Sequence, residues 1–209
     1  IENNFLLSFM NIKSIKFGGT SMGSATSILE CAKVVKEKAQ ECTLIVTVSA
    51  VAGTTDALTK IIGLARKQKP KLVSAEIIAL EKIHKSILKN IVINKQDVEK
   101  IWEEKFQTII MKLKTIAQGT SLVGDLTAKT EAQICAFGEK LSSILMCQAL
   151  NTLGLKNTRI ESEKVIRTDS NYLKANVIFK NTTALCRKYL QPIIKKGIIP
   201  VVTGFIAKD

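Results

Sequence analysis

Short apolar runs alternate along this chain with longer segments in which apolar residues recur at helical spacing. Runs at 12–18, 43–50 and 198–205 have the length and the aliphatic content of buried strands. Over about 24–40, apolar residues return every three or four positions, which predicts a helix that buries one face. Because a strand, a helix and a strand follow one another, we expect the first two strands to be parallel with a right-handed crossover.

The middle of the chain has only helical patterns. A helix is predicted over about 55–68, after which Pro70 interrupts the pattern. Residues 72–118 predict a pair of long antiparallel helices joined by a polar turn at 94–97. The remainder is predicted to form a helix at about 128–152, a polar–apolar alternation at 157–168 and a helix at about 181–196.

Composition indicates a single domain built on buried strands. The 209 residues are enough for one sizeable core, and no linker rich in Pro, Gly or Ser divides them. Hydrophobic residues make up 46% of the chain but aromatic residues only 5%, so aliphatic side chains dominate, as in strands covered by helices on both faces. Residues 1–10 contain an apolar run too short for a signal peptide, and we expect a disordered extension there.

The net charge of +13 has two interpretations. A cationic surface can bind nucleic acid or a membrane face, but a lysine-rich composition gives the same charge without such a partner. Only four arginines occur, and the lysines are spread along the chain. Because arginine is favoured for bidentate contacts to phosphates and bases, we expect no nucleic-acid partner. No apolar run is long enough to cross a bilayer, so we expect no membrane partner either.

Cysteine and histidine usage favours a cytoplasmic protein without a zinc site. The five cysteines are widely spaced and form no C-x-x-C pair, and reduced thiols are the default for such a set. The single histidine, His84, lies among helical apolar residues, where we expect a partly exposed helix residue rather than the partner of a nucleophilic cysteine. Trp102 occupies an apolar position of a predicted helix, and we expect it to pack in the core.

The segment from Lys16 to Ser21, with the sequence KFGGTS, joins the first predicted strand to the first helix. Glycines allow backbone N–H groups to converge on an anion, and the helix N-terminus adds partial positive charge. Ser24, the predicted N-cap of that helix, stands where a Walker loop has lysine, so the Walker motif is excluded. A lysine beside such a turn suits a phosphate in transfer, whereas a glycine turn alone is as consistent with a structural role.

The full string KFGGTS resembles the opening of aspartate kinases, a branch of the amino-acid kinase family. Further segments resemble aspartate-kinase motifs in the same order: 44–58 (LIVTVSAVAGTTDAL), 136–143 (AFGEKLSS), 165–168 (VIRT) and 200–206 (PVVTGFI). The resemblance covers about 11–209. It implies a three-layer α/β/α sandwich with a mostly parallel sheet, in which the helical hairpin at about 72–118 is an insertion that serves as a lid or an interface.

An aspartate kinase transfers the terminal phosphate of ATP to the side-chain carboxylate of L-aspartate. The product is 4-phospho-L-aspartate, and the reaction is the first step of lysine, threonine, methionine and diaminopimelate synthesis. The resemblance therefore implies L-aspartate and ATP as ligands, Mg²⁺ as the metal that accompanies ATP, and a homo-oligomer as an open possibility. Because a carboxylate is already a nucleophile, no general base is needed, in agreement with a chain that has one histidine.

The resemblance also assigns roles to single residues. Lys16 would neutralise charge on the transferred phosphoryl group. Thr55 and Glu139 would bind aspartate, the glutamate through its α-ammonium group, and Phe205 would be either a wall of the substrate site or a core residue. Gly138, inside a predicted helix, indicates close contact with another element or with a ligand. The phosphate oxygens of ATP would be bound by Gly18, Gly19, Thr20, Ser21 and Ser49, although Ser49 is equally consistent with a plain strand cap.

The resemblance ends before the family's G-R-G-G-S-D motif, whose arginine binds substrate and whose aspartate helps to organise phosphoryl transfer. We therefore expect this chain to be the amino-terminal part of a catalytic domain, with no metal ligands of its own and the metal site mostly outside it. Two alternatives stay open. One is a kinase for another amino acid such as glutamate, against which the T-S after Gly19 and the turn at 53–56 argue. The other is a non-catalytic remnant that binds a ligand or a partner subunit.

Overall fold

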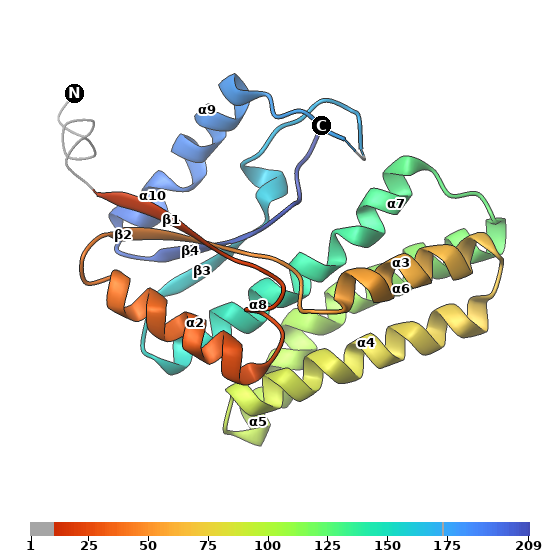
Figure 1. The fold of residues 1–209 in the computed structure, drawn as a ribbon, viewed down its shortest axis with the longest axis horizontal. Helices are drawn as coiled ribbons and strands as arrows, with labels where there is room; N and C mark the ends of the chain where they lie inside the picture. Colours follow the sequence, from red (N-terminus) through yellow and green to blue (C-terminus); the bar gives the residue numbers. More distant parts are fainter. Residues whose placement is uncertain (1–10, 173) are drawn as a thin grey trace.

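A computed structural model of the protein describes residues 11–172 and 174–209, and the extension predicted at 1–10 lies outside the described residues. Within these residues, four parallel strands form one sheet in the order β1-β2-β4-β3 (Figure 1). The three predicted apolar strands are confirmed, and the alternation that follows the long helices supplies the fourth. The strands are β1 (Ile12–Phe17), β2 (Thr43–Val48), β3 (Asn157–Ile160) and β4 (Ile199–Thr203).

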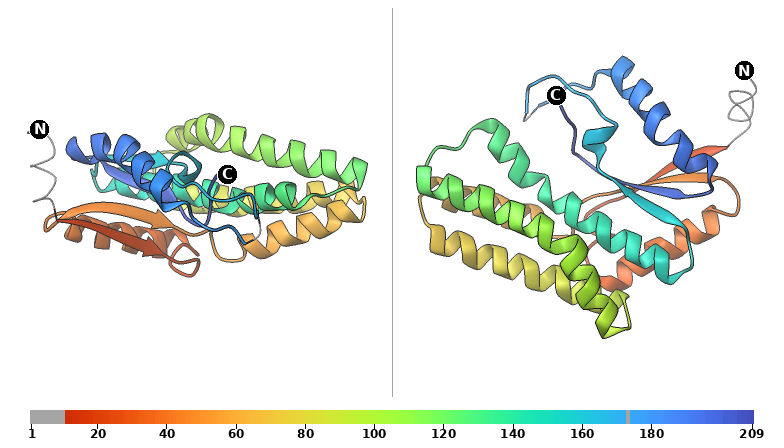
Figure 2. Two further views of the ribbon diagram at one scale, coloured as in Figure 1. Left: turned by 90° about the horizontal axis from the view of Figure 1, so that it is seen from above. Right: turned by 180° about the vertical axis from the view of Figure 1, so that it is seen from behind.

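Helices cover both faces of this sheet, as the resemblance implies (Figures 1 and 2). One face is packed against α2 (Ala25–Lys38) and α8 (Phe137–Thr152). The other face carries α9 (Phe179–Tyr189) and α10 (Gln191–Lys195). The structure is therefore an α/β protein in which a mostly parallel sheet is the middle layer.

The alternating burial of β2 explains these layers. Leu44, Val46 and Val48 are buried in the main core, which they share with α2 and α8. Between them, Ile45 packs on the opposite side against a smaller apolar cluster that includes Leu190. Successive side chains of a strand point to opposite faces, so a nearly continuous aliphatic run is what a strand between two helical layers requires.

The helices between β2 and α8 form an arm beside the sheet (Figure 1). The predicted pair of long helices is confirmed, but the turn between them ends earlier than predicted, because α5 (Lys95–Ile101) begins inside the segment 94–97. The second helical run continues from α5 through a π-helical turn, η2 (Trp102–Phe106). Trp102 and Phe106 stack with their ring centroids 4.8 Å apart and are buried, as expected of core residues. The helices that pack together in the arm are α3 (Thr54–Arg66), α4 (Pro70–Ile91), α6 (Gln107–Val123) and α7 (Ala128–Cys135).

Two of the predicted helices are each divided in the structure. Over 128–152 the chain forms α7 and α8, which meet at Ala136. Over 181–196 it forms α9 and α10, and Pro192 in the first turn of α10 lacks the N–H that would continue the preceding helix. Helix α2 begins where predicted, because the Ser24 side chain accepts a hydrogen bond from the Ser27 N–H at 3.1 Å. None of the helices in the described part of the chain has the length and apolar character needed to span a membrane.

His84 is buried rather than partly exposed, which corrects the expectation from the sequence. Its Nδ1 lies 2.8 Å from the carbonyl oxygen of Leu80, and its Nε2 has no hydrogen-bond partner among the described residues. Burial lowers the pKa of the imidazole to about 4. The expectation was wrong because α4 packs against α2, α3, α6 and α8, so a wider face of it is covered than its apolar spacing indicates.

We predict that His84 makes folding stability depend on pH. The neutral ring is favoured in the folded state, so its contribution is complete above pH 6.5 and is lost as the pH falls toward 4. The loss corresponds to about 3 kcal/mol of unfolding free energy. Urea unfolding between pH 4 and 7 should show a steep fall for the wild-type protein and a flatter one for His84→Leu. Equal slopes for the two proteins would contradict a neutral buried ring, because His84 is the chain's single histidine.

Candidate active site

The carboxyl ends of three neighbouring strands lie in register at one edge of the sheet. Phe17 at the end of β1 is paired with Val48 at the end of β2, and Val48 is paired with Thr203 at the end of β4. Ligands of parallel α/β sheets bind outside this edge. Three loops that could contribute to a site therefore start side by side, at Gly18, Ser49 and Gly204.

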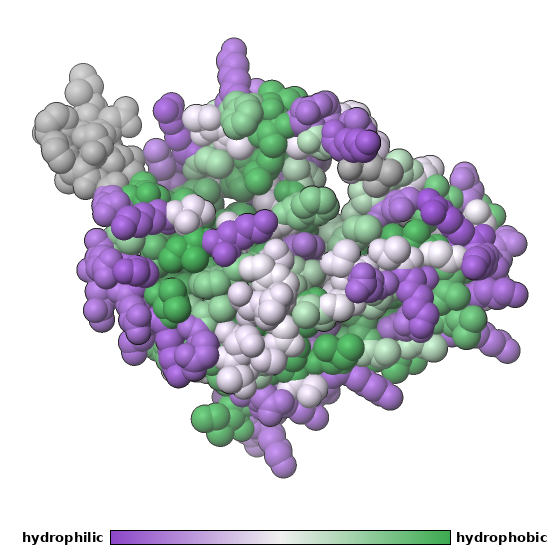
Figure 3. All heavy atoms as spheres, in the orientation of Figure 1, coloured by the Kyte–Doolittle hydropathy of each residue, from purple (hydrophilic) through white to green (hydrophobic). Residues whose placement is uncertain are grey.

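The turn after β1 leaves backbone amides available for an anion. The Met22 N–H donates to the carbonyl oxygens of Gly18 and Gly19, both at 3.1 Å, which closes the turn. Within the described residues, the amides of Gly19, Thr20 and Ser21 donate to no acceptor. In the space-filling view, side chains of intermediate hydropathy cover this turn and the start of α2, bordered by strongly hydrophilic ones (Figure 3). Free amides at a helix N-terminus form an anion-binding site.

Lys16 and Glu139 bring opposite charges to this edge. Lys16 is exposed near the end of β1, whereas Glu139 lies in the first turn of α8 and is only 9% exposed. Burial raises the pKa of the Glu139 carboxyl, and the backbone N–H groups of Glu139 and Ala50, together with the charge of Lys16, oppose this rise. The structure thus places a solvated cation and a desolvated carboxylate close enough to influence each other.

Gly138 sets the distance between α8 and the turn after β2. A Cβ atom at this position would lie 2.7 Å from the Cβ of Ala50 and 3.3 Å from the Cγ2 of Thr54. The helix glycine is therefore explained by contact with another element, one of the two explanations that the sequence left open. Because Glu139 follows directly, the same approach brings its carboxyl group to the Ala50 amide.

Ser142 belongs to the segment 136–143 that resembles an aspartate-kinase motif, but the sequence indicated no role for it. It lies one helical turn beyond Glu139 on α8. It is fully buried, and its Oγ donates to the carbonyl oxygen of Ser49 at 2.6 Å. Ser49 in turn donates its N–H to the carbonyl oxygen of Phe17 at 3.0 Å. Ser49 is thus joined through its backbone to both β1 and α8, beyond the strand-cap role considered from the sequence.

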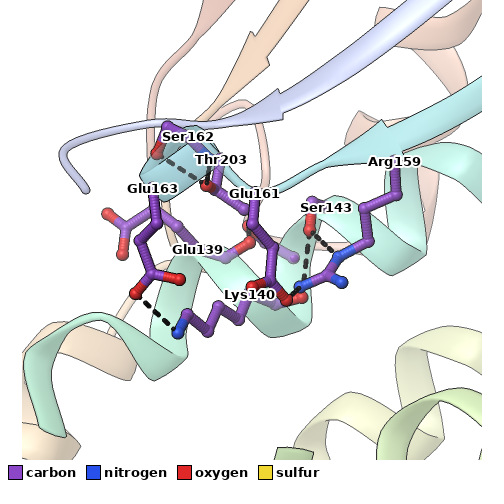
Figure 4. A network of polar contacts seen from close by, with 9 residues as sticks. Glu139, Lys140, Ser143, Arg159, Glu161, Ser162, Glu163 and Thr203 are labelled. Atoms are coloured by element: carbon purple, nitrogen blue, oxygen red, sulfur yellow. Dashed lines mark hydrogen bonds and ion pairs between the residues drawn. The ribbon is translucent and has the colours of Figure 1, made fainter. Parts of the chain in front are cut away.

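A network of polar side chains on another side of α8 was also not predicted from the sequence (Figure 4). Lys140 pairs with Glu163 at 2.9 Å, and the Arg159 guanidinium donates to Ser143 Oγ at 2.8 Å and lies 3.0 Å from Glu161. Burial raises the pKa of the Glu161 carboxyl, but the charges of Arg159 and Lys140, together with hydrogen bonds to Arg159 and Glu163, outweigh this effect and lower the pKa overall. The Glu139 side chain takes no part in these pairs, so its carboxylate is left for another partner.

The two remaining predicted residues, Thr55 and Phe205, are less closely associated with this cluster. Thr55 is exposed in the first turn of α3, next to the buried Thr54 that faces Gly138. Gly204 approaches β2 so closely that a Cβ there would lie 2.7 Å from the Val48 carbonyl oxygen. Phe205 follows with φ of 54° and is 98% exposed, so it is not a core residue. Its role as a substrate wall, like the roles of the other site residues, stays a prediction.

Other parts of the molecule do not extend the site toward a metal. Within residues 11–172 and 174–209, no three His, Cys, Asp or Glu side chains come together in a way that could hold a metal ion. A cavity of about 650 Å³ lies between α6, the start of α8 and the segment after β3, and none of the predicted site residues lines it. The candidate site is therefore the open edge of the sheet rather than this cavity.

The fold and this edge define the class of the protein, an α/β protein with a glycine turn and free backbone amides at the carboxyl ends of a parallel sheet. The chain belongs to the amino acid kinase family, because the family model matches residues 12–209. The sequence-based assignment to this family is confirmed.

The similar curated proteins include several that are named aspartokinases. The chain is 34% identical, over 77% of its length, to an aspartokinase of Chlamydia trachomatis, and 27% identical, over 93% of its length, to chloroplastic aspartokinase 1 of Arabidopsis thaliana. The matched regions are 32% and 33% of those proteins. The chain thus spans about a third of the length of the curated relatives that it matches.

Solved structures of E. coli aspartokinase III share the fold. The complex of that protein with lysine and aspartate has a TM-score of 0.82 at 23% identity, and the match covers 95% of this chain and 42% of that one. The complex with aspartate and ADP has a TM-score of 0.80 at 22% identity.

We predict that Gly138→Ala destabilises the protein. The added methyl group cannot occupy a position 2.7 Å from the Ala50 Cβ, so α8 must move away from the turn at a cost of about 1–3 kcal/mol. The control is Gly119→Ala in α6, where no neighbouring atom lies within 4 Å and alanine favours the helix by up to about 1 kcal/mol. Urea unfolding should therefore show opposite effects, and a neutral or stabilising Gly138→Ala would contradict the close approach.

Proposed function

We propose that this chain supplies the phosphate-binding and aspartate-binding part of an aspartokinase. In the proposed reaction, a side-chain carboxylate oxygen of L-aspartate forms a bond to the γ-phosphorus of ATP. The bond from that phosphorus to the β–γ bridging oxygen breaks, and ADP leaves with the bonding electrons. The observation that carries the proposal is the meeting of Lys16, the free amides of 19–21 and the buried Glu139 at one edge of the sheet.

The turn after β1 and Lys16 are suited to the phosphate side of this reaction. The amides of Gly19, Thr20 and Ser21 can donate to phosphate oxygens, with the hydroxyls of Thr20 and Ser21 beside them. Lys16 adds a full positive charge, which offsets negative charge on the transferred phosphoryl group. Ser49 Oγ, at the end of the neighbouring strand, is proposed to bind the same phosphates.

Glu139 is suited to the amino-acid side. A carboxylate that is 9% exposed and takes part in none of the ion pairs of the described residues can bind an α-ammonium group strongly, because little solvent screens the interaction. Thr55 begins the neighbouring helix and is proposed to help bind the substrate. The acceptor carboxylate needs no general base, so these residues only have to hold it in line with the γ-phosphate.

The relatives support aspartate over other amino acids as the acceptor. The similar proteins from C. trachomatis and A. thaliana are named aspartokinases, and E. coli aspartokinase III has been solved with aspartate and ADP. We propose a cytoplasmic location for this chain, although the A. thaliana relatives are described as chloroplastic. Mg²⁺ would accompany the ATP phosphates, but we assign it no ligands because the described residues contain no suitable group of three.

A second candidate function is ligand binding without catalysis, which requires only the free amides of residues 19–21 and the buried Glu139. One experiment separates the two. Turnover is followed with hydroxylamine, which converts an acyl phosphate to a hydroxamate, while calorimetry measures the binding of L-aspartate and of ATP. Aspartate-dependent hydroxamate supports the kinase, and binding without hydroxamate supports the second candidate. Binding of neither ligand would contradict both.

We predict that Lys16→Met lowers turnover by about 100-fold to 1000-fold, because the developing phosphoryl charge loses its cation. The hydroxamate assay measures the effect. Lys13→Met is the control, since Lys13 is also an exposed lysine of β1 and the change in net charge is the same. Lys13→Met should keep wild-type turnover, and an equal loss in both variants would show that net charge, not position, is responsible.

We predict that the affinity for L-aspartate begins to fall at a pH above the ordinary pKa of a glutamate carboxyl, which is 4.5. Binding of the ammonium group requires ionised Glu139, and burial raises the pKa of this carboxyl above 4.5. Affinity measured by calorimetry should therefore fall as the pH drops from neutrality toward 4.5. Glu139→Gln should bind L-aspartate weakly at every pH, whereas Glu37→Gln, at an exposed position of α2, should keep the wild-type profile. A Glu139→Gln protein with the wild-type profile would remove Glu139 from the proposed site.

A further inference from the structure

Two adjacent serines of α8 form hydrogen bonds to different strands or strand ends. Ser142 Oγ donates to the carbonyl oxygen of Ser49, at the end of β2, over 2.6 Å. Ser143 Oγ accepts from Nε of Arg159, in β3, over 2.8 Å. Both serines are fully buried, so neither can exchange its partner for bulk water. Ser142 and Ser143, two neighbouring buried serines, thus fix α8 to the sheet at two different points.

The partner of Ser142 connects directly to the candidate site. Ser49 donates its N–H to Phe17, which follows Lys16, and Ala50 presents its N–H to the Glu139 carboxyl. The Ser142 hydroxyl also lies 3.3 Å from the carbonyl oxygen of Glu139 itself. One hydroxyl therefore bridges the backbone of Glu139 and the backbone of Ser49, between the lysine strand and the glutamate helix.

The partner of Ser143 connects to a different region. Arg159 also pairs with Glu161 at 3.0 Å, and Lys140 pairs with Glu163 at 2.9 Å, so this side of α8 is fixed to β3 and the segment after it (Figure 4). None of these groups contacts Glu139 through its side chain. Both serines can add to stability, but only Ser142 is placed to control where Glu139 stands relative to Lys16.

We propose that Ser142 is a positioning residue for substrate binding: its hydrogen bond to Ser49 holds the first turn of α8 in the place where Glu139 can bind the ammonium group of an amino acid. The identity of the ligand in this proposal rests on the proposed function, whereas the geometry rests on the hydrogen bond between Ser142 and Ser49. Gly138 permits the approach of α8 to Ala50, and Ser142 fixes the height and rotation of the helix at that approach. Small displacements of a binding group cost large factors in affinity, so a lost positioning bond should weaken binding without removing a contact to the ligand.

The test compares Ser142→Ala, Ser142→Thr and Ser143→Ala in the full chain. Calorimetry measures the dissociation constant of L-aspartate, thermal unfolding measures stability, and a carbon-13 NMR titration follows the carboxyl of Glu139. Ser142→Ala should raise the dissociation constant about tenfold and move the titration midpoint of Glu139, because its distance to the Ala50 amide changes. Ser143→Ala should lower the melting temperature similarly but leave both site readouts unchanged. Ser142→Thr keeps the hydroxyl and should restore the wild-type midpoint.

The outcomes separate this proposal from the proposed function. If Ser142→Ala and Ser143→Ala have the same effect on L-aspartate binding and on the Glu139 titration, Ser142 is merely structural and the positioning role is overturned. If the wild-type protein does not bind L-aspartate, the proposed function fails, and the titration alone decides the positioning role. A midpoint that moves in Ser142→Ala but not in Ser143→Ala then supports it, and a midpoint unchanged in both overturns it.

Discussion

The contact between Gly138 and Ala50 is the constraint on which the candidate site depends. Only a residue without a Cβ allows α8 to come so near to the turn after β2, since an added Cβ would lie 2.7 Å from Ala50. The approach buries the Glu139 carboxyl, brings it to a backbone amide and raises its pKa. It also brings Ser142 within 2.6 Å of Ser49. The electrostatic character of the site therefore follows from packing between a helix and a turn.

The two charged groups of the site are held in different ways. Glu139 is buried in the first turn of α8, so most of its desolvation precedes the arrival of any ligand. Lys16 belongs to an edge strand whose side chains are largely exposed, and its ammonium group is hydrated. An anionic ligand would have to displace that water, whereas an ammonium-bearing ligand would meet a preformed partner. The arrangement favours a rigid position for the amino acid and an adaptable one for the phosphates.

Local patterns in the sequence were sufficient to predict most strands and helices, but not to predict which of them pack against each other. Aliphatic runs identify β1, β2 and β4 because buried strands need apolar side chains on both faces. The placement of β4 between β2 and β3 has no local signal, since it depends on which strand edges remain free after the helices pack. His84 was misjudged for a related reason, because its burial comes from helices that are distant in sequence.

In the candidate site, too, residues marked by a local motif could be predicted, whereas roles that depend on tertiary contacts could not. The glycine turn and Lys16 could be identified because their residues are contiguous, and Glu139 because a motif resemblance marks it. The role of Gly138 could not be chosen from the sequence, since the atoms that exclude a side chain there belong to a turn about 90 residues earlier. Ser142 lies within the same motif resemblance as Glu139, but its role could not be predicted, because the hydrogen bond that distinguishes it is a tertiary contact.

The helical arm is joined to the candidate site at two places. Helix α3 starts at Thr54, beside Gly138, and α7 runs into α8 through the single residue Ala136. The arm also packs along α2 and α8 through α4, and its buried side chains belong to the same apolar core as those of the sheet. A movement of the arm would therefore require repacking against α8, the helix whose first turn carries Glu139.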